Sequence, residues 1–493
     1  MKPFDRRDFV SLAGLLGLAL PFSRTASAAR AGTARKPSIV FILADDLGYA
    51  DLSCYGRPDI STPNIDRIGK EGVRFLQAYA NSAVCSATRT ALITGRYQYR
   101  FRVGLEEPVR DKPAVGLPAD HPTLPSLLKQ AGYRTALLGK WHLGPLPDYG
   151  PLQSGYEHFY GFRGGGVDYY AHTGTSHLKD LWDDDRPVEE QGYLTDLLGE
   201  RAVSLIADYA KSNAPFFMSL HFNAPHWPWE APGDEAESRR LAGKNLMHFD
   251  GGTAETYRKM VERMDFQVGR VLAALRKHSL QKDTIVIFTS DNGGERFSDT
   301  WPFTGKKMEL LEGGLRIPAL VRWPGHVAPG RTHDQVTMSM DWLPTLLAAA
   351  GTVPDAQYPS DGMDLLPALT KNAPAVPRKV FWRYKANAQR ASRDGDFKLL
   401  KILDNTFLFD VVEDPLERAN LKDRRRDVYD RMVREWNEWN ATMLPELRES
   451  ATASTNGADV ADHYGAAPTS GEPDNSPIWP ERKPAPERKP TPE

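Results

Sequence analysis

This chain of 493 residues has little cysteine, no excess of charge of one sign and, after its first thirty residues, no apolar run long enough to cross a membrane. Its two cysteines, Cys54 and Cys85, exclude a framework of several disulfides. The formal net charge of -2 gives no bias towards nucleic acid or an anionic membrane surface. The length instead allows a large core and a smaller second domain.

The N-terminus is typical of an export signal. Arg6 and Arg7 precede an apolar run at 12–20, and residues 26–28 (Ala-Ser-Ala) offer a small-residue cleavage site. The run is too short to span a bilayer, which argues against a membrane anchor. The paired arginines resemble a twin-arginine signal, and the ordinary secretory route stays open. We therefore predict a periplasmic or secreted protein and leave residues 1–30 out of the fold.

Apolar strands and amphipathic helices alternate along most of the chain. Runs rich in β-branched residues predict strands at 38–44, 134–138, 216–222, 284–289 and 319–322. Helical patterns lie among them at 65–71, 124–131, 194–211, 254–278 and 340–350. This alternation favours an α/β fold with a large, mainly parallel sheet sandwiched by helices.

The pattern changes near residue 378, where short alternating segments begin. Strands are expected at 380–384, 397–403 and 405–410, with a helix at 424–439. They indicate a smaller C-terminal α+β domain containing an antiparallel sheet. Beyond about residue 450 the chain is rich in Pro, Gly, Ser, Thr and charge, which predicts disorder. The predicted divisions are an export signal (1–30), a main domain (36–375), an antiparallel-sheet subdomain (376–448) and a disordered tail (449–493).

Polar side chains follow four of the predicted strands at their carboxyl ends. They are Asp45, Asp46, Lys140, His142, His226, Asp291 and Asn292. Ligands of parallel sheets bind beyond the carboxyl ends of the strands, so we expect these side chains to meet at one rim. Each has a plainer alternative when taken alone. Lys140 would be an exposed lysine, His142 a structural histidine, and His226 part of an aromatic wall.

The acidic residues of this rim favour a divalent cation. Asp45 and Asp46 are adjacent carboxylates at a partly buried strand end, so keeping both ionised requires compensation. Asp291 and Asn292 follow another strand, and the Asp291 carboxylate there also requires a compensating positive charge. Three carboxylates and an amide oxygen form a hard site suited to calcium or magnesium rather than zinc. A solvated Asp-Asp turn and an Asn-Gly turn are the alternatives for each motif alone.

Cys85 lies near the expected N-terminus of a helix. Asn81 and Ser82 offer capping side chains, and residues 88–93 can continue as a helix. The N–H groups and dipole of such a terminus favour an anion, and Arg89 would share a helix face with Cys85. The alternatives are a buried small hydrophobic residue, an ordinary thiolate nucleophile, or a disulfide partner of Cys54.

Six segments, in order along the chain, resemble motifs of the sulfatases. They are 44–48 (ADDLG), 85–96 (CSATRTALITGR), 139–144 (GKWHLG), 224–226 (APH), 290–293 (SDNG) and 312–316 (EGGLR). The resemblance runs from about residue 37 to 421 and is to the type I, formylglycine-dependent, arylsulfatase-like branch of the alkaline phosphatase superfamily. Ala87 departs from the pattern, because the family's usual motif has proline there.

The resemblance implies how position 85 and the cation work together. A maturation enzyme would oxidise Cys85 to formylglycine (3-oxoalanine), and the hydrate of this aldehyde would attack the sulfate ester. The cation, Ca²⁺ or alternatively Mg²⁺, would be held by the formylglycine oxygen together with Asp45, Asp46, Asp291 and Asn292.

The remaining catalytic residues are implied by the same motifs. Arg89 would hold the aldehyde hydrate, and Lys140, His226 and Lys307 would contact the sulfate oxygens. Lys307 is preferred to Lys306 because it lies five residues before Glu312. His142 would be the base that releases sulfate from the intermediate. The proton for the leaving alcohol would come from His226 or Lys307.

The function implied is hydrolysis of sulfate monoesters in a sulfated glycan or an aryl sulfate. One alternative is a phosphodiesterase or phosphonate hydrolase of the same superfamily. Another is a sulfated-glycan binding protein in which Ala87 prevents maturation. Specificity would belong to loops 161–185 and 233–252, with Asp168 and His177 as candidates. Aromatic residues that could stack on a sugar or aryl ring are Tyr169, Tyr170, Trp227, Trp229 and Trp301.

Overall fold

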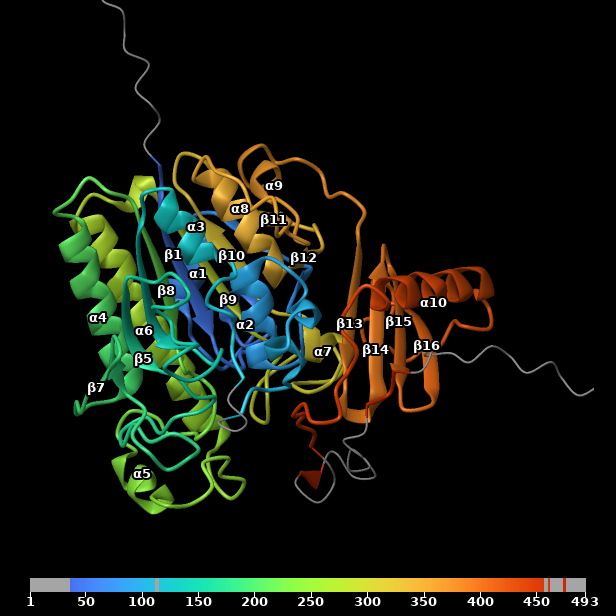
Figure 1. Cartoon of the computed structure of the whole chain (residues 1–493), viewed down its shortest axis with the longest axis horizontal. Helices are drawn as coiled ribbons and strands as arrows, with labels where there is room; N and C mark the ends of the chain where they lie inside the picture. Colours follow the sequence, from blue (N-terminus) through green and yellow to red (C-terminus); the bar gives the residue numbers. More distant parts are fainter. Residues whose placement is uncertain (1–35, 111–114, 456–459, 462–472, 476–493) are drawn as a thin grey trace, which may run out of the picture. The chain divides into compact units, whose positions relative to one another are not determined.

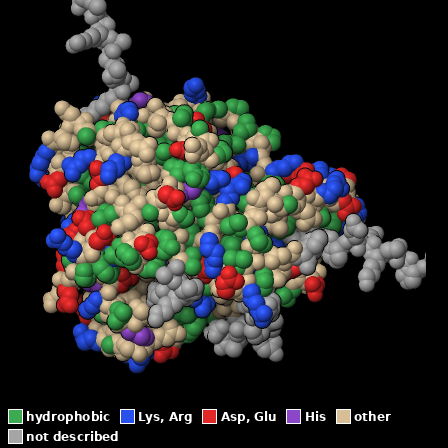
Figure 2. All heavy atoms as spheres, in the orientation of Figure 1, with side chains coloured by type: hydrophobic (Ala, Val, Ile, Leu, Met, Phe, Trp, Pro, Cys, Tyr) green, Lys and Arg blue, Asp and Glu red, His purple; other side chains and the backbone are tan. Residues whose placement is uncertain are grey.

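The computed structural model describes residues 36–110, 115–455, 460–461 and 473–475. The predicted export signal therefore lies outside the described residues, as does most of the predicted tail. No helix among the described residues has both the length and the apolar character needed to cross a bilayer. On the face shown in Figure 2, basic and acidic side chains are interspersed rather than gathered into a large patch of one sign.

The main sheet of the described chain has ten strands in the order β11-β2-β10-β9-β1-β8-β4-β5-β6-β7. Their bounds are β1 Ser38–Ala44, β2 Val73–Phe75, β4 Arg134–Lys140, β5 His158–Phe162, β6 Trp182–Asp183, β7 Arg186–Pro187, β8 Phe216–His221, β9 Thr284–Ser290, β10 Ala319–Arg322 and β11 Arg331–His333. A separate parallel pair joins β3 (Ala78–Tyr79) to β12 (Thr337–Met338).

The centre of this sheet is parallel, which confirms the predicted fold class. β1 pairs in parallel with β8 and β9, and β4 does so with β8 and β5. β10 instead runs antiparallel to β9, because the connection 291–318 contains only a four-residue helix and no crossover helix. β5 was not among the predicted strands.

Helices cover both faces of the sheet (Figure 1). The α-helices of the described chain are α1 Pro63–Lys70, α2 Cys85–Thr94, α3 Leu124–Gln130, α4 Leu194–Tyr209, α5 Glu235–Leu241, α6 Ala254–Lys277, α7 Glu312–Leu315, α8 Trp342–Ala349, α9 Leu366–Thr370 and α10 Arg426–Asn440. Val40 and Ile42 of β1 pack with α1, α4 and α6, whereas Ile39 and Phe41 pack with α2, α3 and α8. Burial on both faces explains the continuous apolar runs of the central strands.

The C-terminal sheet has four antiparallel strands in the order β13-β14-β15-β16. Their bounds are β13 Lys379–Tyr384, β14 Gln389–Asp394, β15 Phe397–Ile402 and β16 Asn405–Asp410. Leu399 and Leu408 pack against Met432 and Trp436 of α10. Trp382, from the same sheet, belongs to the cluster that includes α2 and α7. This sheet therefore lies between its own helix and the elements that begin with Cys85 and Glu312.

Candidate active site

The predicted rim residues come together at the carboxyl ends of the parallel strands. Asp45 and Asp46 follow β1, and Asp291 and Asn292 follow the adjacent β9. The N–H of Asp46 donates to Asp291 Oδ1 over 3.2 Å, which ties the two strand ends together. All four side chains are buried, with exposed fractions of 2% or less.

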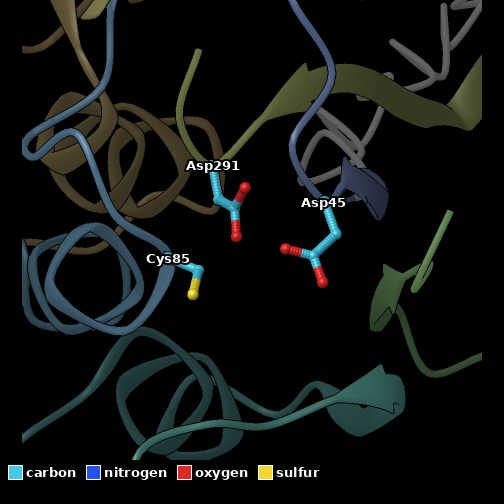
Figure 3. A group of neighbouring side chains, drawn as sticks. All are labelled: Asp45, Cys85 and Asp291. Carbon is cyan, nitrogen blue, oxygen red and sulfur yellow. The ribbon is translucent and has the colours of Figure 1, made fainter. Parts of the chain in front are cut away.

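Cys85 is the first residue of α2 and points into the same space (Figure 3). Its Sγ and one carboxylate oxygen each from Asp45 and Asp291 lie within 4.8 Å of one another. Oxygens of Asp45 and Asp46 and a ring nitrogen of His226 meet the same limit. Cys85 and Cys54 are both free thiols, so the structure contains no bridge between them.

Three cationic side chains compensate the three carboxylates, and Arg89 lies within ion-pair distance of both Asp291 and Asp45. Arg89 Nε donates to Asp291 Oδ2 over 3.0 Å, on the next turn of α2 from Cys85. Lys140 Nζ lies 2.7 Å from Asp45 Oδ2, and Lys307 Nζ lies 2.5 Å from Asp46 Oδ2. Burial acts to raise the pKa of Asp291, but Arg89 and Lys140 outweigh it and hold that pKa below its ordinary value.

Two oxygens among the predicted cation ligands accept no hydrogen bond. Asp45 Oδ1 and Asn292 Oδ1 are buried and accept no hydrogen bond, although Arg89 Nη2 lies 3.8 Å from Asp45 Oδ1. Burial holds the pKa of Asp45 well above its ordinary value, even though Lys140 opposes the shift. A buried oxygen without a partner is costly, so both atoms favour a further positive group beside them. Oxygens of this kind suit Ca²⁺ or Mg²⁺, and the residues present therefore fit a divalent cation.

His142 lies against Cys85 in a defined tautomer. Its Nε2 is 3.0 Å from the carbonyl oxygen of Val109, which can only accept, so this nitrogen carries the proton. Its Nδ1 is 3.3 Å from Cys85 Sγ and presents a lone pair to it. Burial, followed by the charge of Lys140, holds the pKa of His142 well below its ordinary value. The imidazole is thus neutral and able to accept a proton.

The backbone is strained at two of these residues. Asp46 has a φ of 63° and His142 a φ of 58°, in the left-handed region that side chains disfavour. Strain of this kind clusters at functional sites, where the surrounding structure holds it in place.

His226 lies next to Asp46. Its Nδ1 donates to the carbonyl oxygen of Trp227 over 2.7 Å, and its Nε2 is 3.5 Å from Asp46 Oδ2. Burial, then Lys307 and Lys140, hold the pKa of His226 well below its ordinary value. Of the paired lysines, Lys307 is the one whose ammonium group lies at the rim.

A cavity of about 620 Å³ opens onto these groups. Its lining includes Cys85, His142, His226 and Lys307. Such a concave, partly apolar site is typical of ligand binding.

Family models match nearly all of the described chain. The model described as Sulfatase matches residues 37–352, and the one described as N-sulphoglucosamine sulphohydrolase, C-terminal, matches residues 301–441. The chain belongs to the sulfatase family. It is a type I sulfatase, an enzyme that hydrolyses sulfate esters.

Named relatives and solved structures agree with this assignment. The sulfatase is 33% identical to the N-acetylgalactosamine-6-sulfatase of Mus musculus over 75% of this chain and 72% of that one. It is 32% identical to human arylsulfatase A over 80% of each chain. A structure of Ps i-CgsB in complex with k-i-k-neocarrahexaose has a TM-score of 0.76 and 31% identity, covering 87% of this chain and 97% of that one.

The alternative of a phosphonate hydrolase has support from fold alone. The phosphonate monoester hydrolase of Agrobacterium radiobacter has a TM-score of 0.60 with 22% identity. It shows that the fold is shared, and the identity is too low to indicate a shared substrate.

The structure of the sulfatase divides the predicted aromatic residues into those that line the cavity and those that do not. Trp227 lines the cavity, and so does Trp182, which the sequence had not suggested. Tyr169 is buried with its hydroxyl bonded to backbone, and Trp301 is 67% exposed. The described lining residues do not include Tyr169, Tyr170, Trp229 or Trp301, nor the loop candidates Asp168 and His177.

Two further residues of the rim were missed. Glu295 is half-buried, with Oε2 3.6 Å from Lys307 Nζ, and loss of solvent around it raises its pKa. Its position four residues after Asp291 was a usable signal. His221 ends β8, with Nδ1 3.3 Å from Arg89 Nη1, and burial and Arg89 lower its pKa to about 3. Nothing in the sequence distinguishes His221 from an ordinary strand residue.

Proposed function

We propose that this sulfatase hydrolyses sulfate monoesters of a saccharide, with formylglycine made from Cys85 and with Ca²⁺ at the rim. The observation that carries the proposal is the convergence of Cys85 Sγ with oxygens of Asp45 and Asp291. The unpartnered oxygens Asp45 Oδ1 and Asn292 Oδ1 beside them support a cation.

The cation and the aldehyde supply what the unmodified side chains lack. Asp45, Asp46, Asp291 and Asn292 would hold the cation, with position 85 as a further ligand. When bound, the two groups supply positive charge and a hydroxyl that is nucleophilic near neutral pH.

The chain's own cations oppose the charge of the substrate. A sulfate monoester is anionic, so a nucleophile must approach it against repulsion. Lys140 and Lys307 lie at this rim and stabilise negative charge as the sulfuryl group is transferred. Arg89 lies 2.9 Å from Asp291 Oδ2 and thereby holds a carboxylate of the site in place.

The two histidines have different proton roles. His142 presents an unprotonated Nδ1 to position 85 and is placed to take a proton from the hydroxyl there. His226 Nε2 faces Asp46 Oδ2, which also pairs with Lys307. Burial acts to lower the pKa of Lys307, but Asp46 and Glu295 outweigh it, so Lys307 keeps its proton and acts as a charge. The proton of His226 is held on Nδ1 by the carbonyl of Trp227, so Lys307 is the one of the two that carries a proton towards the site.

A saccharide substrate is favoured over a simple aryl sulfate. The relatives include an N-acetylgalactosamine-6-sulfatase, and the matched structure of Ps i-CgsB holds an oligosaccharide. The cavity is large enough for more than one sugar ring, and Trp182 and Trp227 give it aromatic walls. We further propose that the chain is exported to the periplasm or the medium, and that a formylglycine-generating maturation enzyme modifies Cys85.

Peptide mass spectrometry with matched assays tests this function. In the purified chain, the peptide containing position 85 should show sulfur exchanged for oxygen with loss of two hydrogens. That protein should release sulfate from sulfated oligosaccharides and turn over aryl phosphodiesters far more slowly. Cys85→Ala is the control and should lower kcat by a factor on the order of 10⁶. An unmodified Cys85 with tight glycan binding and no turnover would contradict the proposal.

A further inference from the structure

A short C-terminal segment, residues 451–453, pairs with the main domain beside the active site. The N–H of Glu107 donates to the carbonyl oxygen of Ala451 over 3.0 Å, and the N–H of Ala453 donates to that of Glu107 over 2.7 Å. These bonds form a parallel bridge between Glu107 and Thr452. The segment lies beyond both family-model matches, which end at residues 352 and 441.

Side chains secure the segment on both sides. The N–H of Ala451 donates to Glu106 Oε2 over 2.7 Å. Thr452 Oγ1 accepts from the N–H of Ala386 over 3.2 Å, and Tyr384 donates its hydroxyl to the carbonyl oxygen of Ala453 over 2.6 Å. The segment therefore joins the 106–109 loop to strand β13 and the turn after it.

The same loop holds the histidine that faces Cys85. Two residues after Glu107, the carbonyl oxygen of Val109 accepts the proton of His142 Nε2. The N–H of Val109 donates to Ser86 Oγ over 2.9 Å, so the loop is also tied to the residue after Cys85. The segment thus binds Glu107, which lies two residues before the carbonyl group that sets the tautomer of His142.

We propose that residues 451–453 are a positioning element that holds the Glu107–Val109 loop and thereby keeps the proton of His142 on Nε2. The inference rests on the role proposed above for His142. If the loop shifts, Nε2 loses its acceptor and the proton can move to Nδ1, which then has no lone pair for position 85. Ala453 also lines the cavity, so the segment forms part of its wall.

Removing one hydrogen bond of the segment from the full-length protein tests the proposal. Ala453→Pro deletes the N–H that Glu107 accepts from, whereas Ala453→Gly at the same position retains it. We expect Ala453→Pro to lower kcat for a small aryl sulfate about tenfold or more, with KM changing much less. The loss of kcat should be much smaller in Ala453→Gly, which keeps the N–H and removes only a methyl group from the cavity wall. Because Ala453→Pro can also destabilise the chain, rates are divided by the folded fraction.

A second pair of variants avoids changing the backbone. Thr452→Val removes the hydroxyl that Ala386 donates to and should lower kcat in the same direction by a smaller factor. Thr442→Val is the matched control, because Thr442 is exposed and its hydroxyl bonds only to the carbonyl oxygen of Trp439. An unchanged kcat in Ala453→Pro, or an equal loss in Ala453→Gly, overturns the inference.

The formylglycine content of each variant separates this inference from the proposed function. Rates are divided by the modified fraction found by peptide mass spectrometry. Wild-type protein that is unmodified and inactive contradicts the proposed function. Active, modified wild type with unaffected variants contradicts only the role of residues 451–453.

Discussion

Two clusters of buried charge in this sulfatase are built from the same kinds of side chain but differ in what they leave open. At the rim, Asp45, Asp46 and Asp291 face Arg89, Lys140 and Lys307. At the junction with the C-terminal sheet, Glu312 and Glu417 face Lys398 and Arg316. Both clusters are buried and hold opposite charges at ion-pair distance.

The junction cluster lies away from the cavity. Lys398 Nζ lies 3.0 Å from Glu312 and 2.9 Å from Glu417, as ion pairs rather than aligned hydrogen bonds. Tyr79 donates its hydroxyl to Glu312 over 2.7 Å. The described residues that line the cavity do not include Glu312, Glu417, Lys398 or Arg316. Their charges therefore connect two parts of the fold.

The rim cluster differs from the junction cluster in its place beside the cavity. Its Lys307 lines the cavity together with Cys85, and its Asp45 Oδ1, which lies 3.8 Å from Arg89 Nη2, accepts no hydrogen bond. Balanced charge alone thus does not separate a structural cluster from a catalytic one. Buried oxygens without a hydrogen bond occur in both clusters, and the difference lies in the space that a ligand can enter, which the rim borders through Lys307 and the junction does not.

Removal of the cation should give the largest effect on turnover and should disturb only the rim cluster. We expect a chelator to abolish turnover and to lower the unfolding temperature, because three carboxylates then repel one another with less compensation. A cation present at 100 times its Kd stabilises a protein by about 2.7 kcal/mol. Thermal scans and sulfate release with and without added Ca²⁺ measure both effects. Turnover and unfolding temperature that both ignore the chelator would count against a cation site.

The two adjacent lysines provide the next test. Lys307→Ala should lower kcat/KM about 10²–10³-fold, as expected when a group that stabilises the transition state is removed. Lys306→Ala is the matched control and should have little effect, because Lys306 is not part of the cavity lining. Steady-state kinetics on a sulfate ester measures both. Equal losses in the two variants would show that the pair acts through general charge.

Breaking the junction cluster should affect stability and spare the chemistry. Lys398→Met leaves Glu312 and Glu417 buried without their shared cation. Removing one partner of a buried ion pair costs about 3–5 kcal/mol in the free energy of unfolding. Denaturant titration measures this loss, and the activity per folded molecule should stay near that of the wild type. A large fall in that specific activity would mean that the junction also shapes the rim.

The smallest effect is a change in how stability depends on pH. Burial raises the pKa of Glu417 from 4.5 to about 7, although Lys398 opposes the shift. The folded state therefore binds more protons than the unfolded state between these values, and this carboxyl should make stability fall as pH rises from 4.5 to 7. Glu417→Gln should flatten that part of the profile, measured by unfolding at several pH values. An unchanged slope would assign the dependence to other groups.

The contribution of Glu312 falls in a different pH range. Burial acts to raise its pKa, but Lys398 and Arg316 outweigh it and hold that pKa far below 4.5. The stability that Glu312 contributes is therefore present above pH 4.5 and is lost only as pH falls below it. The two glutamates can thus be distinguished in one titration.

Much of the architecture could be predicted from local pattern. Strands such as 38–44 are apolar throughout because helices cover both of their faces, and parallel strands bring their carboxyl ends to one rim. The same reasoning placed Asp45 and Asp291 at that rim. Strand β14 was missed because its arginines, Arg390 and Arg393, are buried by partners from distant segments and look like surface residues in the sequence.

The amino-acid sequence by itself determined the central strands, the helix that starts at Cys85 and the residue types at each strand end, since these depend on neighbours a few positions away. Only the tertiary structure decided that Lys307, already preferred for its spacing to Glu312, pairs with Asp46, that Glu312 itself belongs to the junction, and that residues 451–453 lie beside Glu107. Each of these depends on contacts between segments more than 80 residues apart. Contacts over such separations come from packing and charge pairing in space, which periodicity and spacing do not record.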